Sequence, residues 1–287
     1  MKRIILLRDK LTSVINITGL SLGMGACMLI VFWISVESDF DSFHNEPDNI
    51  YRVMSYATTY MVDGFPATPG PLGPKAKERM PEIEKQTRIF GLTDRAFTYN
   101  DNAIVSECGL CVDPDFFDIF SYRLIAGNDD NWLSEPSSIV LTASLSKKVF
   151  GTTDAIGEKL KVNNKPLTVT GIIDDVPVNS HLKYEYIISV EDVRDYSSLD
   201  HWGSFNFNTY FRTVDNIDIN DVGEKLTRVG RDNNCPHVLQ DSLVFKLQNI
   251  KDIYLDTPVK APYPYFRLGS RRLINNFMII TVIIIIM

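Results

Sequence analysis

The longest apolar stretch in the chain runs from Leu11 to Val36. Its 26 residues include no Asp, Glu, Lys or Arg. At about 1.5 Å of rise per residue, a helix of this length would extend roughly 39 Å, enough to cross a hydrocarbon core of about 30 Å with some tilt. The pattern therefore predicts a transmembrane helix at residues 11–36, preceded by a short segment at residues 1–10.

Charged residues change sign across this predicted helix. The basic residues before it and the acidic residues after it are Lys2, Arg3, Arg8 and Lys10, then Glu37, Asp39 and Asp41. Because Lys and Arg are enriched on the cytoplasmic side of a membrane, residues 1–10 are expected in the cytoplasm and everything after Val36 outside it.

Two other interpretations of the N-terminus fit less well. A cleaved signal peptide has an apolar region of about 7 to 15 residues and a small-residue cleavage site, whereas this stretch is longer and no A-x-A follows it. The segment Met24–Cys27 loosely resembles a lipoprotein signal, but the nine residues after Cys27 are uncharged and mainly apolar. An uncleaved membrane helix is therefore preferred.

Small residues recur inside the predicted helix. Gly19 with Gly23, and Ser21 with Gly25, form two overlapping small-xxx-small patterns. In lipid, small side chains let helix backbones approach closely. These four residues are predicted to pack on another membrane helix; the alternative is that glycine is simply commoner in membrane helices.

A second apolar stretch, Ile274–Met287, closes the sequence. Its 14 residues reach only about 21 Å as a helix, short of the membrane core. We expect residues 274–287 to be the truncated start of a second transmembrane helix, with an interfacial segment as the alternative. The aromatic residues before it, Tyr254, Tyr263, Tyr265 and Phe266, suit the membrane interface, and core packing is their alternative.

Between the two stretches, the hydrophobic pattern predicts two β-α-β units. The first comprises Ile50–Tyr60, a helix over Leu72–Met80 that Pro71 or Pro74 opens, and Ile83–Phe90. The second comprises Phe205–Val214, a helix capped by Asp218 or Asn220, and Leu243–Gln248. Two such units in one sheet form a split β-α-β sandwich of ferredoxin-like type.

A β-rich subdomain at residues 96–204 is predicted to be inserted between these units. Its strands are Ala96–Tyr99, Ala103–Cys108, Tyr122–Ile125, Ile139–Leu141, Lys159–Val162, Leu167–Ile173 and Tyr184–Val190, and its helices are Asp113–Phe120 and Ala143–Phe150. Thr142 is the expected N-cap of the second helix and Gly151 the residue that ends it. The predicted fold class is α+β: a transmembrane helix, then a two-lobed domain in which residues 37–95 and 205–273 form one lobe and the insertion the other.

Composition excludes some functions. The chain has 287 residues, a formal net charge of −7 and a pI near 5.2, which argues against nucleic-acid binding because such proteins carry a basic patch. The sequence contains no H-E-x-x-H and no G-x-S-x-G, and Gly151–Lys159 has the wrong spacing for a phosphate-binding loop. We therefore expect a protein that is not an enzyme and has no cofactor or metal of its own.

Three groups of residues carry chemistry that could form a site. Cys108 and Cys111 form a C-x-x-C that could be a disulfide, a redox pair or, with Cys235 and His237, a zinc site, although buried structural cysteines are the simpler interpretation. Asp174–Asp175 is expected to form a turn. The histidines His181, His201 and His237 lack a nucleophile at a recognisable spacing. His44 is expected at the surface near the membrane.

Taken together, several segments resemble the N-terminal part of MacB/FtsX-type ABC-transporter permeases. These segments are Asn16–Gly23, Phe40–His44, Ile50–Val53, Phe116–Phe120, Ile139–Thr142, Lys148–Gly151, Ile156–Gly157, Val169–Gly171 and Val176–His181. Each segment alone is weak, but their joint order is specific. The resemblance implies a MacB-like periplasmic domain between a first and a second membrane helix.

The resemblance also implies a mechanism and partners. Such permeases lie in the bacterial inner membrane with four or more helices, form dimers, and pair with a cytoplasmic ABC ATPase that binds the ATP. A periplasmic adaptor or an outer-membrane protein is a further expected partner. ATP-driven movement of the membrane helices would move the periplasmic domains, which expel a substrate or act on a partner. The sequence departs from this pattern in lacking the third and fourth helices.

The sequence is compatible with two alternative functions. A single-pass, membrane-anchored binding or sensor module could use the same fold. An extracytoplasmic enzyme with an unrecognised site is the other, and a deep pocket with convergent polar groups would favour it.

Overall fold

The computed structural model describes residues 2–57, 64–100, 102–127, 132–133, 135, 137–194, 198–239, 243–257 and 263–286. The chain forms two compact units. The first comprises Met1–Phe40 with Gly269–Met287, and the second comprises Asp41–Leu268.

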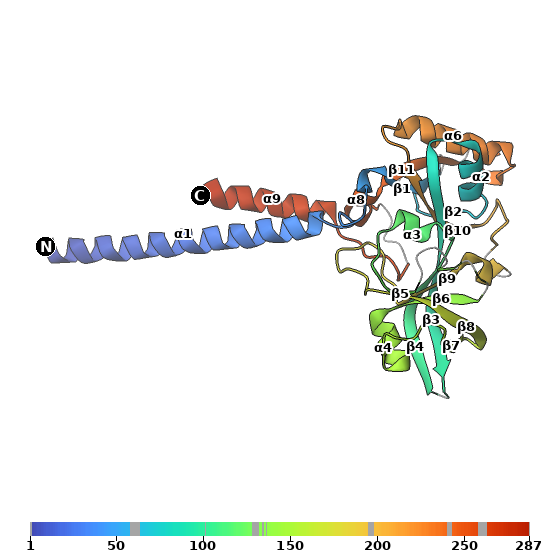
Figure 1. Cartoon of the computed structure of the whole chain (residues 1–287). Helices are drawn as coiled ribbons and strands as arrows, with labels where there is room; N and C mark the ends of the chain where they lie inside the picture. The colour runs from blue at the N-terminus through green and yellow to red at the C-terminus, as the bar shows by residue number, and fades with distance from the viewer. Residues whose placement is uncertain are drawn as a thin grey trace. The chain divides into compact units, whose positions relative to one another are not determined.

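The first unit is a pair of helices, α1 (Lys2–Ser38) and α9 (Arg271–Ile286), which are coloured blue and red in Figure 1. The predicted apolar helix is present: within α1, Thr12–Ser38 is long and apolar enough, by length and composition, to cross a membrane, and it is the one such helix among the described residues. The two helices contact each other through Trp33 and Phe277, whose rings lie edge to face at 5.1 Å.

Half of the second unit is the predicted split β-α-β sandwich. Its elements are β1 (Ile50–Ala57), α2 (Leu72–Arg79), β3 (Ile83–Tyr99), β10 (Phe205–Thr213), α6 (Ile219–Asp232) and β11 (Leu243–Asn249). The strand order is β11-β1-β10-β3, with antiparallel neighbours, as a ferredoxin-like sheet requires. Both helices pack against this sheet (Figure 1), and their core includes Leu72, Ala76, Leu226, Phe211 and Phe245. Residues 58–60 of the first predicted strand lie outside the described residues.

The predicted helix caps are confirmed. The Asp218 carboxylate accepts hydrogen bonds from the backbone N–H groups of Asn220 and Asp221, and thereby starts α6. Thr142 Oγ1 accepts from the Leu145 N–H at the start of α4 (Ala143–Phe150), which has the predicted bounds. That helix ends at Gly151, whose φ of 77° is left-handed backbone that glycine adopts without strain.

The other half of the unit is β-rich, as predicted, and its strands close into a ring. It adds β4 (Asn102–Val112), β5 (Leu124–Gly127), β6 (Ser138–Thr142), β7 (Lys159–Val162), β8 (Lys165–Ile173) and β9 (Tyr186–Ser189). The pairings β3-β4, β4-β9, β9-β6, β6-β8, β8-β7 and β7-β3 return to the starting strand. The ring is filled by a second apolar core that includes Phe97, Leu141, Leu160 and Tyr186.

Two strand predictions were wrong in their extent. Ile83–Phe90 and Ala96–Tyr99 are not separate strands but parts of the single strand β3, and β4 continues past Cys108 to Val112. The division at residue 95/96 therefore falls inside a strand that belongs to both halves of one sheet. Short elements that were not predicted are β2 (Thr68–Pro69), η1 (Pro47–Asn49), η2 (Val190–Val193), α7 (Pro236–Leu239) and α8 (Ile250–Asp256), while α3 is shorter than predicted (Phe116–Ile119).

Candidate functional site

A buried polar cluster lies where the chain enters the second unit. We call residues Asp41–His44 the incoming segment, because they follow α1 directly, and Val176–Lys183 the clasp loop. Asp41 is fully buried, and its N–H donates to the carbonyl of Asn179 at 2.8 Å. Its carboxylate accepts from the His181 N–H at 3.0 Å and from Ser180 Oγ at 3.4 Å. The incoming segment is thus fixed to the clasp loop by backbone and side chain.

Two imidazoles complete the contacts of Asp41. His181 Nδ1 lies 2.9 Å from Asp41 Oδ2, and His181 Nε2 lies 2.9 Å from the hydroxyl of Tyr210 on β10. His44 Nε2 lies 3.7 Å from Asp41 Oδ1, while its Nδ1 accepts a hydrogen bond from the Ser121 N–H. The cluster therefore links the incoming segment, the clasp loop and the central sheet.

The charges of this cluster are set by burial and by proximity. Burial alone would raise the pKa of the Asp41 carboxyl, but the charge and hydrogen bonds of His181, together with His44, outweigh it and hold that pKa well below its ordinary value. Burial lowers the pKa of His44, and Asp41 only partly opposes this. Near neutral pH, Asp41 is therefore an anion and His44 an uncharged ring.

A buried arginine lies on the neighbouring strand. Arg52 of β1 is fully buried, and its Nη2 donates to Gln248 Oε1 at 2.6 Å and to Thr257 Oγ1 at 2.8 Å. Its guanidinium carbon lies 5.5 Å from the centre of the Phe266 ring. Burial lowers the pKa of Arg52 and raises the pKa of Tyr210, but each group keeps its ordinary charge at neutral pH.

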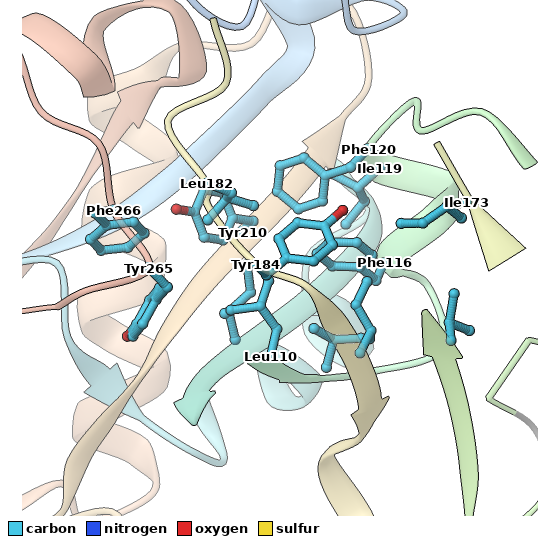
Figure 2. Close-up of a cluster of buried hydrophobic side chains, with 14 of the residues drawn as sticks. Leu110, Phe116, Ile119, Phe120, Ile173, Leu182, Tyr184, Tyr210, Tyr265 and Phe266 are labelled. Carbon is cyan, nitrogen blue, oxygen red and sulfur yellow. The ribbon is translucent and has the colours of Figure 1, made fainter. Parts of the chain in front are cut away.

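The chain leaves the unit along the same loop. We call Tyr263–Leu268, which lies just before Gly269 and α9, the outgoing segment. Arg267 donates from Nη1 to the carbonyls of Pro177, Ser180 and Leu182 at 2.8, 3.1 and 3.3 Å, and from its backbone N–H to His181 O at 2.7 Å. Figure 2 shows the neighbouring Phe266 beside Leu182, with which it forms a β-bridge.

The arrangement joins three chain segments and is not open to a ligand. Asp41 and His181 have no exposed side-chain surface, so a substrate has no access to their polar atoms. Among the described residues, no group of three or more His, Cys, Asp and Glu side chains could hold a metal ion. What the cluster can do is hold the incoming and outgoing segments on one loop; we call the three segments together the clasp.

The cysteines do not form any of the proposed sites. Cys108 and Cys111 are both free and buried within β4, where residues three apart face opposite sides of a sheet and lie about 10 Å apart. A bridge between them is therefore excluded, as is the strand-to-helix setting of a redox pair. Cys235 lies in the core under α6, so the zinc set with His237 does not assemble. Burial raises the pKa of Cys108 to about 12, which keeps the thiol protonated.

Two placements near the membrane were wrong. His44 is buried rather than at the surface, because Phe120 and Tyr122 pack around its ring. The aromatic residues expected at the membrane interface lie in the protein core instead. Tyr254, Tyr265 and Phe266 are buried, and Tyr263 is partly buried against the core, so core packing is the correct alternative. Tyr263, Tyr265 and Phe266 thus attach the end of the second unit to its core.

The remaining candidates have local contacts. Asp175 accepts from the N–H and hydroxyl of Ser144, and so holds the first turn of α4, while Asp174 pairs with the exposed Arg123. In the first unit, a Cβ added at Gly23 would lie 3.4 Å from Ile284 of α9. At Gly19 and Gly25 an added Cβ would meet no described atom within 4 Å. Helix packing by these glycines and Ser21 stays a prediction.

The lowered pKa of His44 predicts a loss of stability on mild acidification. The unfolded chain takes up a proton at His44 near pH 6.5, whereas the folded chain does so only at lower pH, so folding is weakened as pH falls below about 6.5. Protonation of His44 changes the free energy of unfolding by at most about 1.4 kcal/mol per pH unit. Chemical unfolding of the full chain in detergent at pH 7.5, 6.5 and 5.5 measures it.

The matched variant is His44→Gln, which cannot take up a proton there. As the pH falls, its unfolding free energy should decrease less than that of the wild type. Asp41 and His181 face position 44 in both proteins, so their own contribution is common to the two pH profiles. Parallel pH profiles for the two proteins would contradict the assignment of His44 as a buried neutral ring.

Comparison with known proteins agrees with this architecture. A domain from a Porphyromonas gingivalis protein named as a permease superposes with a TM-score of 0.63 and 21% sequence identity, over 82% of this chain and 99% of that one. The periplasmic region of MacB from Actinobacillus actinomycetemcomitans superposes with a TM-score of 0.52 and 14% identity, over 71% and 90%. At these identities the likeness shows the fold. No curated protein matches the chain.

The family itself is shown by a sequence model. The model described as the MacB-like periplasmic core domain matches residues 13–229, a range that includes most of α1, the incoming segment, the clasp loop and β10. This chain, with its apolar N-terminal helix and the folded unit that follows, belongs to the family of MacB-like periplasmic core domains of ABC-type permeases.

Proposed function

We propose that the second unit is a transmitter of movement: it receives ATP-driven displacement from α1 and α9 through the clasp and delivers it in the periplasm. The observation that carries the proposal is that the incoming segment and the outgoing segment are both bonded to the same loop. A pull on either segment would then act on one loop and, through His181 and Tyr210, on the central sheet.

The buried setting suits a mechanical joint. Hydrogen bonds to charged groups are stronger than those between neutral groups, and they strengthen further where water is excluded. Asp41, which is buried, and Arg267, which is half-buried, both contribute hydrogen bonds to a charged group, one at each segment. A joint of this kind resists small displacements and passes them on.

The remaining parts of the proposal come from the family. The ATP would be bound by a cytoplasmic ABC ATPase, and a second copy of the permease would complete a dimer in the bacterial inner membrane. A periplasmic adaptor or an outer-membrane protein would receive the movement. The multi-pass topology and the absence of a cofactor in this chain belong to the same proposal.

The test uses the intact permease with its ATPase in lipid nanodiscs. A spin label at Val105→Cys, an exposed position on β4, reports the separation of the two domains of a dimer with and without trapped ATP. In Arg267→Ala we expect ATP hydrolysis to continue while the ATP-dependent change in that distance is lost. The control is Arg123→Ala, since the Arg123 side chain is exposed and faces the partly exposed Asp174 at 3.4 Å. An Arg267→Ala protein that moves like the wild type would overturn the proposal.

The contact between α1 and α9 provides a second prediction. Leucine at position 23 would meet Ile284, whereas leucine at position 25 has open space around its Cβ among the described residues. Gly23→Leu should therefore reduce ATP-dependent movement at least fivefold without changing the unfolding of the second unit. Gly25→Leu serves as the matched control, and equal effects of the two variants would reject a packing role for Gly23.

A further inference from the structure

The clasp loop carries an apolar side chain at a position where one is unusual. Residues Pro177–Ser180 form a tight turn, closed by the Ser180 N–H donating to the Pro177 carbonyl at 3.1 Å. Val178 lies at the tip and is 85% exposed, more than any other large apolar residue described in Asp41–Leu268. Turn tips usually carry Gly, Asn, Asp or Ser, so the valine has no evident role in forming the turn.

This tip is held in place from both sides. The carbonyl of Pro177, just before Val178, accepts from Arg267 of the outgoing segment. The carbonyl of Asn179, just after it, accepts from the N–H of Asp41 in the incoming segment. Val178 is therefore presented on a turn that is hydrogen-bonded on both sides.

Chain connectivity limits how far this turn can lie from the membrane. Asp41 follows the last residue of α1, Ser38, by three positions, and Arg267 precedes the first residue of α9, Arg271, by four. At about 3.6 Å per residue these connections span at most about 11 and 14 Å. The polar headgroup region on one side of a bilayer is about 5–7.5 Å deep, so these two short connections hold the turn close to the headgroups.

We infer that the tip of the clasp loop contacts the outer surface of the membrane, with Val178 inserted among the lipid headgroups. The inference rests on the proposed function only in taking α1 and α9 as membrane helices. A small apolar side chain on a rigid turn can enter the boundary between headgroups and acyl chains, where amphipathic segments also bury their apolar faces. The clasp would then be seated on the bilayer as well as on its two connecting segments.

A fluorescence measurement on the full chain tests this contact directly. The cysteines at positions 27, 108, 111 and 235 are buried, so a cysteine at Val178→Cys can be labelled selectively with an environment-sensitive nitrobenzoxadiazole dye. The labelled chain is placed in nanodiscs of phosphatidylethanolamine and phosphatidylglycerol that contain a lipid spin-labelled near the headgroup. We expect this lipid to quench the dye at position 178 at least twofold.

Two control positions distinguish a specific contact from general exposure. Val105→Cys on β4 and Leu239→Cys on α7 replace apolar residues that are 56% and 48% exposed and lie outside the clasp. Dyes there should show little quenching. Equal quenching at all three positions, or none at position 178, would overturn the inference. A dye at position 178 that is shifted to the blue but not quenched would indicate a protein contact instead and would also overturn it.

The measurement stands apart from the test of the proposed function. It needs no ATPase and no ATP, so a failure here leaves the Arg267→Ala experiment unaffected. Because Val178 is exposed, its replacement should leave the unfolding midpoint of the chain unchanged, which confirms that the labelled protein is folded.

Discussion

Asp41→Asn should lower the free energy of unfolding of the second unit by about 3 kcal/mol, because it removes a buried charged acceptor and leaves buried donors without a partner. The asparagine side chain keeps the size of Asp41 but removes the charge that faces His181 and His44. It also replaces one acceptor oxygen by an N–H₂ group that points at other donors. A loss of this size is a large share of the total stability of a typical domain, about 5–15 kcal/mol.

Urea unfolding of the full chain in detergent, followed by tryptophan fluorescence, measures this effect. The matched control is Asp174→Asn, because Asp174 is about half exposed and faces the still more exposed Arg123 at 3.4 Å. Such surface pairs contribute about 0–1 kcal/mol. If both variants shift the unfolding curve by the same small amount, the buried cluster does not hold the incoming segment as described.

Gly91→Ala is the second substitution with a large expected effect. A Cβ at this position of β3 would lie 1.9 Å from Cε1 of Tyr265, in the outgoing segment. The ring cannot simply swing away, because its hydroxyl donates to Asn208 Oδ1 at 2.8 Å and its flanks pack on Phe266. We expect a loss of about 2 kcal/mol, as for overpacked cores, and faster proteolysis within residues 263–268.

Gly203→Ala is the control for this substitution, because the nearest described atom to an added Cβ there is 3.9 Å away. A double variant with Tyr265→Ala provides a sharper check. Since the clash needs both side chains, the alanine at position 91 should cost little once the ring is gone, so the two effects should be strongly non-additive. Additive effects would show that Gly91 acts through the backbone of β3 rather than through Tyr265.

Local signals accounted for most of the helices. Asp218 and Thr142 start α6 and α4 where their side chains can cap an N–H group, and Gly151 ends α4 where a left-handed residue is needed. The apolar run of 26 residues predicts α1 from its composition alone. Each of these features depends on neighbouring residues or on one continuous stretch, which is why the sequence alone suffices.

The pairing of strands that lie far apart in the sequence was harder to predict. Ile83–Phe90 and Ala96–Tyr99 were predicted as separate strands, but β3 continues between them because β4 pairs with it on both sides of the gap, from Ile89 to Tyr99. The ring that closes through β7 depends on Phe97 and Val162 meeting across 65 positions. No local pattern encodes such a closure, although the alternation of apolar residues within each strand did predict the strands themselves.

The clasp illustrates the same limit at the functional site. The polar residues of Phe40–His44 and Val176–His181 were noted because these segments resemble the family, but Asp41 and His181 lie 140 positions apart. The short spacing between Asp41 and His44, with Phe40 and Phe43 beside them, was the one local signal of a buried polar turn. The polar surroundings of His44 in the sequence pointed instead to the surface, and Arg267 gave no signal at all.

Hydrogen exchange in the working transporter tests the central claim most directly. The claim is that the clasp stays closed while it passes on movement, so the N–H groups of His181 and Arg267, which donate to Asp41 and to the His181 carbonyl, should remain bonded. With the intact permease and its ATPase in nanodiscs, these amides should exchange slowly with and without ATP turnover, and quickly in Asp41→Asn. Fast exchange in the wild type during ATP turnover, with the domains still moving, would contradict the account.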